Sequence, residues 1–398
     1  MKSYVRKSYK LPELFDMYMG KTPDRNNPEY WENGTHPWIS IADMTSNGKL
    51  VTHTKECITD KAIRETGIKP INYNTVIMSF KLSVGKVSKV ATVSTPAYSN
   101  EAIMAFEIPP VPVGSPMILN DYAYYLLQSL DFTNTGNKAV MGKTLNKAIL
   151  QNTIVNVHID LKVQSEIVSV LDKITALIDK RREQLETLDE LVKARFVELF
   201  GDPVVNPHNY PKVSLSELAE IKIGPFGSLL HKDDYIENGH ALVNPSHIID
   251  GRVSVDNKLT ISDEKYDELS AYHLLVGDVV MGRRGEMGRC AVVSESGLLC
   301  GTGSLLIRTK GSVTADYLQK IISFPTFKKT IEDMAVGQTM PNLNVPIVSN
   351  FQIIKPPMEV QKSYYDFVEQ MDKLKLEVQK ALSQLETLKK SLMQKYFG

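Results

Sequence analysis

The chain contains 398 residues, of which 42% are hydrophobic and 23% are charged, a composition typical of a globular protein with two or three domains. Lysine plus arginine and aspartate plus glutamate number 46 each, so the formal net charge is zero. This balance excludes a protein that holds nucleic acid by bulk positive charge alone.

The cysteines and the apolar segments indicate the compartment. Cys57, Cys290 and Cys300 show no zinc-type spacing, which favours free thiols in a reducing cytosol. The first residues lack the apolar core of a signal peptide, and no run of 18 apolar residues occurs. We therefore expect a cytoplasmic protein that does not cross a membrane.

Residues 1–157 show the pattern of a mixed α/β domain. Strands are predicted at residues 75–78 and 88–93, and a helix at residues 121–130. Prolines separate these elements, as in residues 108–112. The pattern predicts a twisted sheet but not the order of its strands.

Residues 164–201 predict one long helix, because neither proline nor glycine interrupts them before Gly201. Its length of about 57 Å, at 1.5 Å per residue, is typical of a coiled-coil arm. Apolar residues recur in steps of three, four and seven, the heptad pattern of a coiled-coil seam. The predicted seam residues are Ile167, Leu171, Ile174, Ile178, Leu185, Leu188 and Val192.

Residues 202–398 repeat both patterns. Strands are predicted at residues 276–281 and 289–293, and a helix at residues 315–322. Residues 361–398 then match the first long helix without a gap, and both copies contain Gln-Leu-Glu-Thr-Leu and end in Phe-Gly. The predicted seam residues of the second helix are Met371, Leu374, Val378, Leu385, Leu388 and Leu392.

The two seams have two possible explanations. An exposed apolar seam is unfavourable in water, so the simplest arrangement buries the two seams against each other. The alternative is two separate core helices that belong to two domains. Heptads sustained over four or more repeats favour pairing.

The segments in front of the helices also correspond. Leu11-Pro-Glu-Leu14 aligns with Leu215-Ser-Glu-Leu218, and residues 75–86 align with residues 278–289. A repeat of this length indicates a domain duplication and not a solenoid.

Catalytic motifs are not found. The segment from Gly136 to Thr144 resembles a P-loop, but five residues separate its glycines where four are needed. Gly282, Gly285 and Gly288 lack the GxGxxG spacing of a dinucleotide site. The eight histidines form no HExxH pair, and the cysteines have no metal partners at suitable spacing. These observations favour a recognition protein without a catalytic residue, metal or cofactor of its own.

The order of motifs resembles the specificity subunit of a type I restriction–modification system, and the resemblance covers the whole chain. It is carried by residues 22–31 (TPDRNNPEYW), 37–44 (PWISIADM), 224–228 (GPFGS) with Tyr235 and Gly239, 337–344 (GQTMPNLN), and the two long helices. The first half departs from the second at two places. It has residues 142–147 (GKTLNK) where the second has residues 337–342 (GQTMPN), and Ile159-Asp160 where the second has Pro356-Pro357. The geometry of the first junction between domain and helix is therefore left open.

This resemblance implies an α+β fold with a pseudo-twofold repeat. Two mixed α/β target-recognition domains would occupy residues 1–157 and 202–355, and helical arms at residues 158–201 and 356–398 would pair as an antiparallel coiled coil. Each domain would bind one half of a bipartite, asymmetric site in double-stranded DNA, and the coil would set the spacer.

The resemblance also implies partners. Two methyltransferase (modification) subunits and further restriction subunits would join this non-catalytic chain. They would bind the S-adenosylmethionine, ATP and Mg²⁺ that the complex needs.

Candidate DNA contacts lie in polar loops that begin with or contain glycine. Adjacent Arg283 and Arg284 are suited to guanine or to phosphates, and asparagine is suited to adenine. A solvated, charged hairpin is an equally good interpretation of this turn. The candidates are Lys21, Thr22, Lys81, Lys86, Ser228, Lys232, Asn244, Ser246, Arg283, Arg284, Arg289 and Gln338.

Two other functions remain open. One is a free-standing, sequence-specific DNA-binding coiled-coil protein with no methyltransferase partner. The other is a nuclease or methyltransferase whose motifs have diverged. The sequence predicts neither the bases recognised nor the spacer length.

Overall fold

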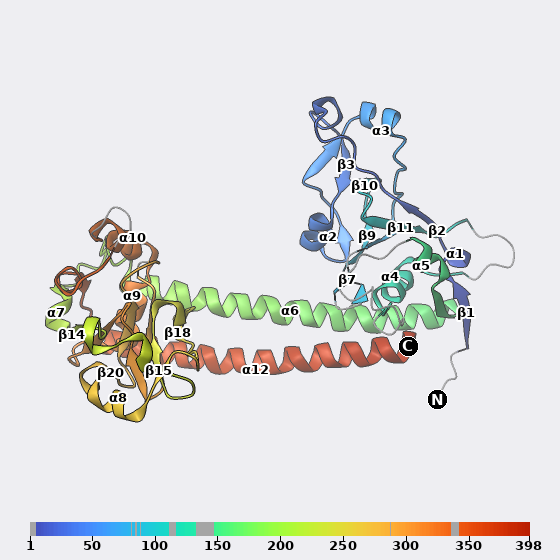
Figure 1. The fold of residues 1–398 in the computed structure, drawn as a ribbon. Helices are drawn as coiled ribbons and strands as arrows, with labels where there is room; N and C mark the ends of the chain where they lie inside the picture. The colour runs from blue at the N-terminus through green and yellow to red at the C-terminus, as the bar shows by residue number, and fades with distance from the viewer. Residues whose placement is uncertain are drawn as a thin grey trace. The chain divides into compact units, whose positions relative to one another are not determined.

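The computed structural model describes residues 5–80, 82–83, 86–87, 89–110, 117–132, 147–286, 288–335 and 342–398. The chain divides into two compact units, and each contains a globular part and a part of both long helices (Figure 1). Unit 1 comprises Met1–Glu183 and Val378–Gly398, and unit 2 comprises Gln184–Glu377.

The globular part of unit 1 alternates short strands with short helices. In chain order its elements are β1 (Arg6–Lys10), α1 (Leu11–Leu14), β2 (Asp16–Met19), β3 (His36–Ile39), α2 (Ile41–Asn47), β4 (Leu50–Val51), β5 (Glu56–Ile58), α3 (Asp60–Thr66), β6 (Val76–Ser79), β7 (Leu82–Ser83), β8 (Lys86–Val87), β9 (Val90–Val93), β10 (Tyr98–Ser99), β11 (Ile103–Glu107), α4 (Asn120–Gln128), α5 (Lys147–Asn152) and β12 (Ile154–His158). The strands predicted at residues 75–78 and 88–93 correspond to β6 and β9, and the predicted helix corresponds to α4.

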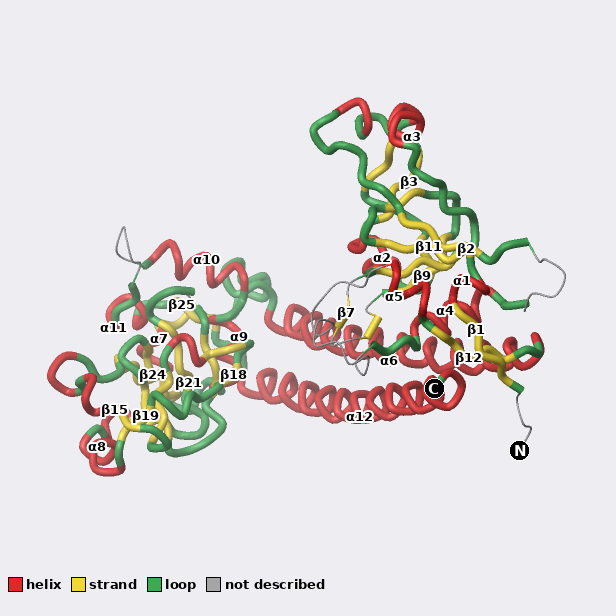
Figure 2. Tube along the Cα trace, turned by 45° about the vertical axis from the view of Figure 1, so that its right-hand side comes forward, coloured by secondary structure: helices red, strands yellow, loops and turns green. Residues whose placement is uncertain are grey.

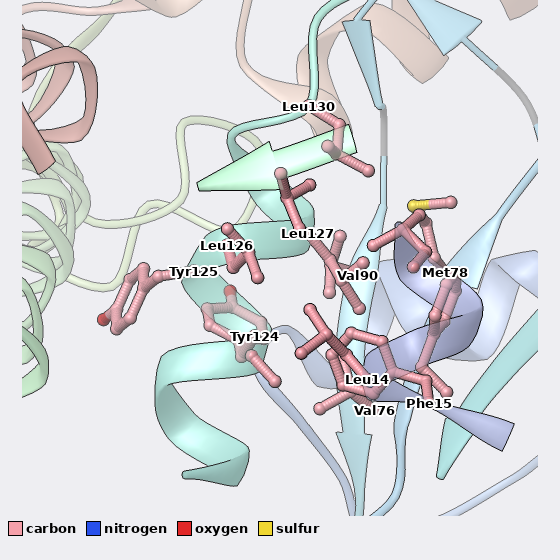
Figure 3. Packing of buried hydrophobic residues seen from close by; sticks show 14 of the residues in the cluster. Leu14, Phe15, Val76, Met78, Val90, Tyr124, Tyr125, Leu126, Leu127 and Leu130 are labelled. Carbon is pink, nitrogen blue, oxygen red and sulfur yellow. The ribbon is translucent and has the colours of Figure 1, made fainter. Parts of the chain in front are cut away.

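The core of unit 1 lies between a sheet and α4. The sheet has the order β2-β11-β6-β9-β4, and only the pair β4–β9 is parallel. Val76 and Val90 pack in one cluster with Leu127 of α4, whereas Tyr125 points away from the strands (Figure 3). Ile77 belongs to a second cluster, because successive strand residues point to opposite faces of a sheet.

Unit 2 repeats this architecture. In chain order its elements are β13 (Lys212–Ser214), α7 (Leu215–Leu218), β14 (Ala219–Ile223), β15 (Tyr235–Ile236), β16 (His240–Val243), β17 (Ile248–Ile249), β18 (Arg252–Val253), β19 (Thr260–Ile261), α8 (Asp263–Glu268), β20 (His273–Leu274), β21 (Val279–Gly282), β22 (Cys290–Val292), β23 (Leu298–Cys300), β24 (Ser304–Thr309), α9 (Ala315–Ile322), α10 (Pro325–Met334), α11 (Val345–Ser349) and β25 (Gln352–Ile354).

The strand order confirms the internal repeat. The antiparallel order β14-β24-β21-β22 of unit 2 reproduces β2-β11-β6-β9 of unit 1. Helix α9 contacts β21 as α4 contacts β6, and Figure 2 shows α9 beside the strands of unit 2. The parallel pair β16–β23 reproduces β3–β10, and the pair β13–β25 reproduces β1–β12. The sequence pattern alone did not predict this strand order.

The two long helices are present and pair. They are α6 (Leu161–Phe200) and α12 (Met358–Phe397), of 40 residues each. A positive φ of 69° at Gly201 ends α6, as the glycine predicted. Among the described residues, no helix is long and apolar enough to span a membrane.

The direction of pairing follows from contacts within each unit. In unit 1, Leu171 packs in one cluster with Leu392 of α12, and Arg182 forms an ion pair with Glu386 at 2.8 Å. In unit 2, Asp189 contacts Lys375 at 2.6 Å, and the ring of Phe200 lies 5.5 Å from that of Tyr364. Contact positions on α12 fall as positions on α6 rise, so the segments run antiparallel.

The seam of α6 lies where the heptads predict it. Ile167, Leu171, Ile174 and Ile178 are at most 8% exposed, and Leu185, Leu188 and Val192 are partly covered.

The seam of α12 departs from the prediction at two positions. Met371, Val378, Leu385 and Leu392 are partly covered, but Leu374 and Leu388 are 43% and 48% exposed. Lys375 and Lys389 take the covered positions in their place. A lysine stem can cover apolar surface while its ammonium group reaches a polar or aromatic partner. Here Asp189 contacts Lys375, and the ring of Tyr125 lies 6.0 Å from the Lys389 ammonium.

Candidate nucleic-acid interface

Two turns of unit 2 that the sequence analysis considered separately form one surface. The turn between β21 and β22, described at residues 283–286 and 288–289, meets the turn at residues 244–247. A Cβ atom at Gly282 would lie 3.1 Å from that of Pro245, so glycine allows the close approach. Arg289 adds a hydrogen bond from Nη1 to the carbonyl oxygen of Pro245 at 3.3 Å.

Arg283 is built into this surface. Its Nε donates to Oδ1 of Asn342 at 3.0 Å, and its carbonyl oxygen accepts the N–H of Leu343 at 3.0 Å. Burial and the adjacent positive charge of Arg284 lower the pKa of Arg283. Phe80, the aligned residue of unit 1, is 3% exposed. This position therefore faces the protein in both units.

Arg284 has the opposite character. Its side chain is exposed and forms no ion pair with any residue that the structure describes. Its backbone forms a bridge with Asn342, so the position is held, and the guanidinium group has no partner among the described residues. Such a group is suited to bidentate hydrogen bonds with phosphate or with guanine.

Arg289 is compensated by a carboxylate. Its Nε donates to Glu286 at 3.1 Å, its Nη2 bonds the same carboxylate, and Lys328 donates to Glu286 at 3.2 Å. These hydrogen bonds lower the pKa of Glu286. The three charged side chains line a surface cavity of about 590 Å³ together with Ser246 and Gln319. The carboxylate of Glu286 therefore partly neutralises the positive charge of Arg289, whereas Arg284 has no carboxylate partner among the described residues.

Asn244 and Ser246 lie on the neighbouring turn. A Cβ atom at Gly301 would come within 2.3 Å of Oδ1 of Asn244, so the absence of a side chain there leaves room for the amide. Asn244 is partly covered, and Ser246 is exposed at the cavity.

The first loop of each unit starts from the same backbone contact. A Cβ atom at Gly20 would lie 2.0 Å from the carbonyl oxygen of Ser99, and one at Gly224 would lie 2.1 Å from that of Gly301. Only glycine allows this approach. The loops that follow these glycines are therefore equivalent in position, as their alignment predicts.

The side chains of these two loops differ. Lys21 donates to the carbonyl oxygen of Thr66 at 2.8 Å, and Thr22 donates to Glu101 at 2.5 Å, so intramolecular bonds use both groups. Ser228 and Lys232 are exposed. Lys81 and Gln338 lie outside the described residues, and the side chain of Lys86 in β8 is also outside them.

Among the residues that the structure describes, no three histidine, cysteine, aspartate or glutamate side chains are grouped to hold a metal ion. Burial raises the pKa of the Cys290 thiol to about 11 and that of the Cys300 thiol to about 12. Thiols with such values are largely protonated at neutral pH and are poor nucleophiles.

Sequence reasoning missed three side chains of this surface. Glu286 and Lys328 form its charge cluster, and Asn342 positions Arg283. Asn342 lies in the motif at residues 337–344, which supported the family resemblance but predicted no contact with Arg283. Lys328 lies in α10, for which the sequence showed no motif. Only the folded chain brings these residues together.

Comparison with known proteins identifies relatives of the whole chain. Residues 6–188 and 207–387 match the family model described as Type I restriction modification DNA specificity domain. The type I restriction enzyme MjaIX specificity subunit of Methanocaldococcus jannaschii is 21% identical over 97% of this chain and 91% of its own length. The EcoR124I/EcoR124II specificity subunit of Escherichia coli is 32% identical over 30% of this chain and 28% of its own length.

Solved structures share the fold. One solved structure is described as showing the structural basis underlying complex assembly and conformational transition of the type I R-M system. A chain of that structure superimposes on this chain with a TM-score of 0.62. It is 15% identical and covers 98% of this chain and 97% of its own. The S subunit of a type I system from M. genitalium has a TM-score of 0.51 and 13% identity, and covers 100% and 97%.

Proposed function

Because the chain belongs to the type I restriction–modification DNA specificity family, we propose that each of its units binds one half of a bipartite DNA site. The two halves of such a site are separated by a spacer, and the paired helices α6 and α12 set its length. The chain performs no chemistry itself. Methylation and cleavage are supplied by partner subunits, which bind S-adenosylmethionine, ATP and Mg²⁺.

The observation that carries this proposal is one architecture built twice with different side chains at equivalent loops. The two sheets share their strand order. In the aligned sequences, however, the first half has Phe80 and Lys81 where the second half has Arg283 and Arg284. A repeated scaffold with different loop chemistry favours two half-sites of different sequence.

Within unit 2 we assign the direct DNA contact to Arg284. It is exposed and lacks a carboxylate partner among the described residues, whereas Arg283 and Arg289 form hydrogen bonds within the protein. Ser246 lies on the adjoining turn and offers a hydroxyl group at the same surface. Arginine supplies both phosphate neutralisation and guanine contacts.

The spacer follows from helix length. A helix of 40 residues is about 60 Å long at 1.5 Å per residue, and half-sites on one face of DNA lie about 34 Å apart or a multiple of that distance. Two antiparallel helices of equal length therefore suit a fixed separation between half-sites.

We assign the binding of partner subunits to apolar side chains that remain exposed to solvent when the two helices pair. Leu177 and Leu191 of α6 are 47% and 46% exposed, and Leu374 and Leu388 of α12 are 43% and 48% exposed. Leu374 is the repeat equivalent of Leu177, and Leu388 is that of Leu191. Repeat-related apolar positions fit two copies of one partner, which agrees with two methyltransferase subunits.

The test is a methylation map of the source cell's DNA with and without this gene. Loss of a single split, asymmetric methylated motif supports the proposal and identifies both half-sites. If the map is unchanged while the purified chain still binds specific DNA, the chain is a free-standing DNA-binding protein. If the purified chain turns over DNA by itself, the non-catalytic assignment is wrong.

A further inference from the structure

Each long helix is joined to its globular part by a completely buried glutamine. Gln164 lies in the first turn of α6 and is 0% exposed. Its Oε1 accepts the N–H of Leu119 at 2.9 Å, and its Nε2 donates to the carbonyl oxygens of Met117 at 3.1 Å and His158 at 2.7 Å. One amide thus holds both the residue before α4 and the strand that leads into α6.

The second unit repeats this arrangement. Gln361 in the first turn of α12 is also 0% exposed. Its Oε1 accepts the N–H of Thr314 at 3.1 Å, and its Nε2 donates to the carbonyl oxygen of Pro356 at 3.0 Å. Thr314 directly precedes α9, as Leu119 precedes α4. The two glutamines are repeat equivalents. Each accepts the N–H of the residue before α4 or α9 and donates to a carbonyl oxygen shortly before its own long helix, although the carbonyl groups of His158 and Pro356 differ by one position in the repeat.

A buried tyrosine reinforces each junction. The hydroxyl oxygen of Tyr122, in α4, lies 2.8 Å from Nδ1 of His158 and accepts the backbone N–H of His158 at 3.2 Å. Tyr317 of α9 donates to the carbonyl oxygen of Ile354 at 2.7 Å. Both tyrosines are 0% exposed, so side chains of α4 and α9 hold the segment before each long helix.

The junctions keep this arrangement although the first lacks the paired proline. In unit 1 the carboxylate of Asp160 accepts the N–H of Lys162 at 2.8 Å. The carbonyl oxygen of Asp160 accepts the N–H of Gln164 at 3.1 Å, as that of Pro357 accepts the N–H of Gln361 at 3.2 Å. The glutamine bonding is therefore the feature that the two junctions share.

We infer that Gln164 and Gln361 are positioning residues that determine how strictly the protein discriminates between spacer lengths. This inference depends on the proposed function. A helix of 40 residues is about 60 Å long, so a tilt of about 10° at one end moves the other by about 10 Å, or about three base-pair steps of 3.4 Å. Helix length alone cannot define a spacer unless the helix leaves its globular part at a fixed angle.

The test uses the full chain assembled with its methyltransferase partner. DNA duplexes carry both half-sites with the natural spacer or a spacer changed by one or two base pairs, and methylation rates are measured for each duplex. We expect the natural complex to prefer its own spacer by at least about tenfold. Gln164→Met and Gln361→Met keep a side chain of similar size without its hydrogen bonds, and we expect them to reduce the preference to about threefold or less.

Two control variants separate a change in the angle of the helix from a loss of thermal stability. Leu274→Ala, which creates a cavity in a core cluster of unit 2 that contains no residue of the junction, is expected to lower thermal stability and keep the spacer preference. Tyr317→Phe, a milder change at the junction, is expected to relax the preference partly and serves if a glutamine variant does not assemble.

The possible outcomes are distinct. If the natural complex shows no preference for any split site, the proposed function fails. If the natural complex prefers its own spacer, and the folded Gln164→Met, Gln361→Met and Tyr317→Phe variants keep the same preference, the proposed function stands and this inference is overturned.

Discussion

Arg283 and Arg284 are neighbours in the sequence, yet their side chains have different surroundings. Asn342 holds the guanidinium group of Arg283, and that of Arg284 is exposed. Both residues lie in the turn after β21, where the backbone of Arg284 forms a bridge with Asn342 and the side chain of Arg283 donates to Oδ1 of that same asparagine. Phe80, the equivalent of Arg283 in unit 1, is buried directly after β6.

Arg284→Ala is expected to weaken binding to the half-site of unit 2 by about tenfold, because an arginine contact to DNA contributes about 1–3 kcal/mol. Its thermal stability should stay within about 0.5 kcal/mol of the natural protein. Arg283→Ala should instead destabilise the fold by about 1 kcal/mol, because Oδ1 of Asn342 loses its donor.

Fluorescence anisotropy with duplexes that vary one half-site, together with thermal melting, checks both arginine variants. Lys373→Ala is the matched control, since it removes one positive charge from an exposed side chain of α12. Equal losses at both half-sites would contradict the assignment of Arg284 to one unit.

The buried thiols give a second prediction for single residues. At pH 8 iodoacetamide should modify Cys57, which is partly exposed, and spare Cys290 and Cys300 until the protein unfolds. Unfolded thiols ionise near pH 8.5, but burial raises the folded pKa of Cys290 to about 11 and of Cys300 to about 12. The thiols therefore stabilise the fold below about pH 8.5, and this contribution declines as the pH rises toward those folded values.

Mass spectrometry of the alkylated peptides, with and without denaturant, measures which thiol reacts. Rapid modification of Cys300 in the folded protein would show that the interior of unit 2 opens readily.

At the scale of elements, α12 shows how a repeated heptad can pair through different positions. Both helices were predicted to bury apolar residues at alternating steps of three and four. In α12 the covered positions include Lys375 and Lys389, while Leu374 and Leu388 are exposed. Burial lowers the pKa of Lys389, and its aliphatic stem fills the seam.

Leu171→Ala should therefore destabilise the protein by about 3 kcal/mol, as expected for a cavity at a buried leucine. Leu388→Ala should change stability by no more than about 0.5 kcal/mol, since its side chain is half exposed. Urea unfolding of the two variants measures the difference. Leu388→Ala is instead expected to reduce the amount of methyltransferase that copurifies, and equal unfolding curves for the two variants would contradict the assigned seam.

At the scale of the whole molecule, the duplication provides two scaffolds joined by helices of equal length. An added heptad in both α6 and α12 lengthens each by about 10.5 Å, or about three base-pair steps. We expect methylation at a spacer about three base pairs longer, or loss of activity where the seams no longer match. A methylation map of cells carrying the variant measures the spacer, and an active variant with the natural spacer would refute this role of the helices.

The sequence by itself determined the repeat, the two long helices, the seam of α6 and the main strands. These features depend on local periodicity and on glycine and proline, which act over a few neighbouring residues. The family resemblance also followed from the order of motifs along the chain, because a duplicated order is visible without a structure.

Only the tertiary structure decided which of these residues face the protein and which face solvent. Asn342, Lys328 and the amides of Gln164 and Gln361 acquire their partners from segments distant in sequence. Burial and hydrogen bonding of a polar side chain depend on what the fold places opposite it. For the same reason periodicity could not distinguish Leu388 from Lys389 on α12.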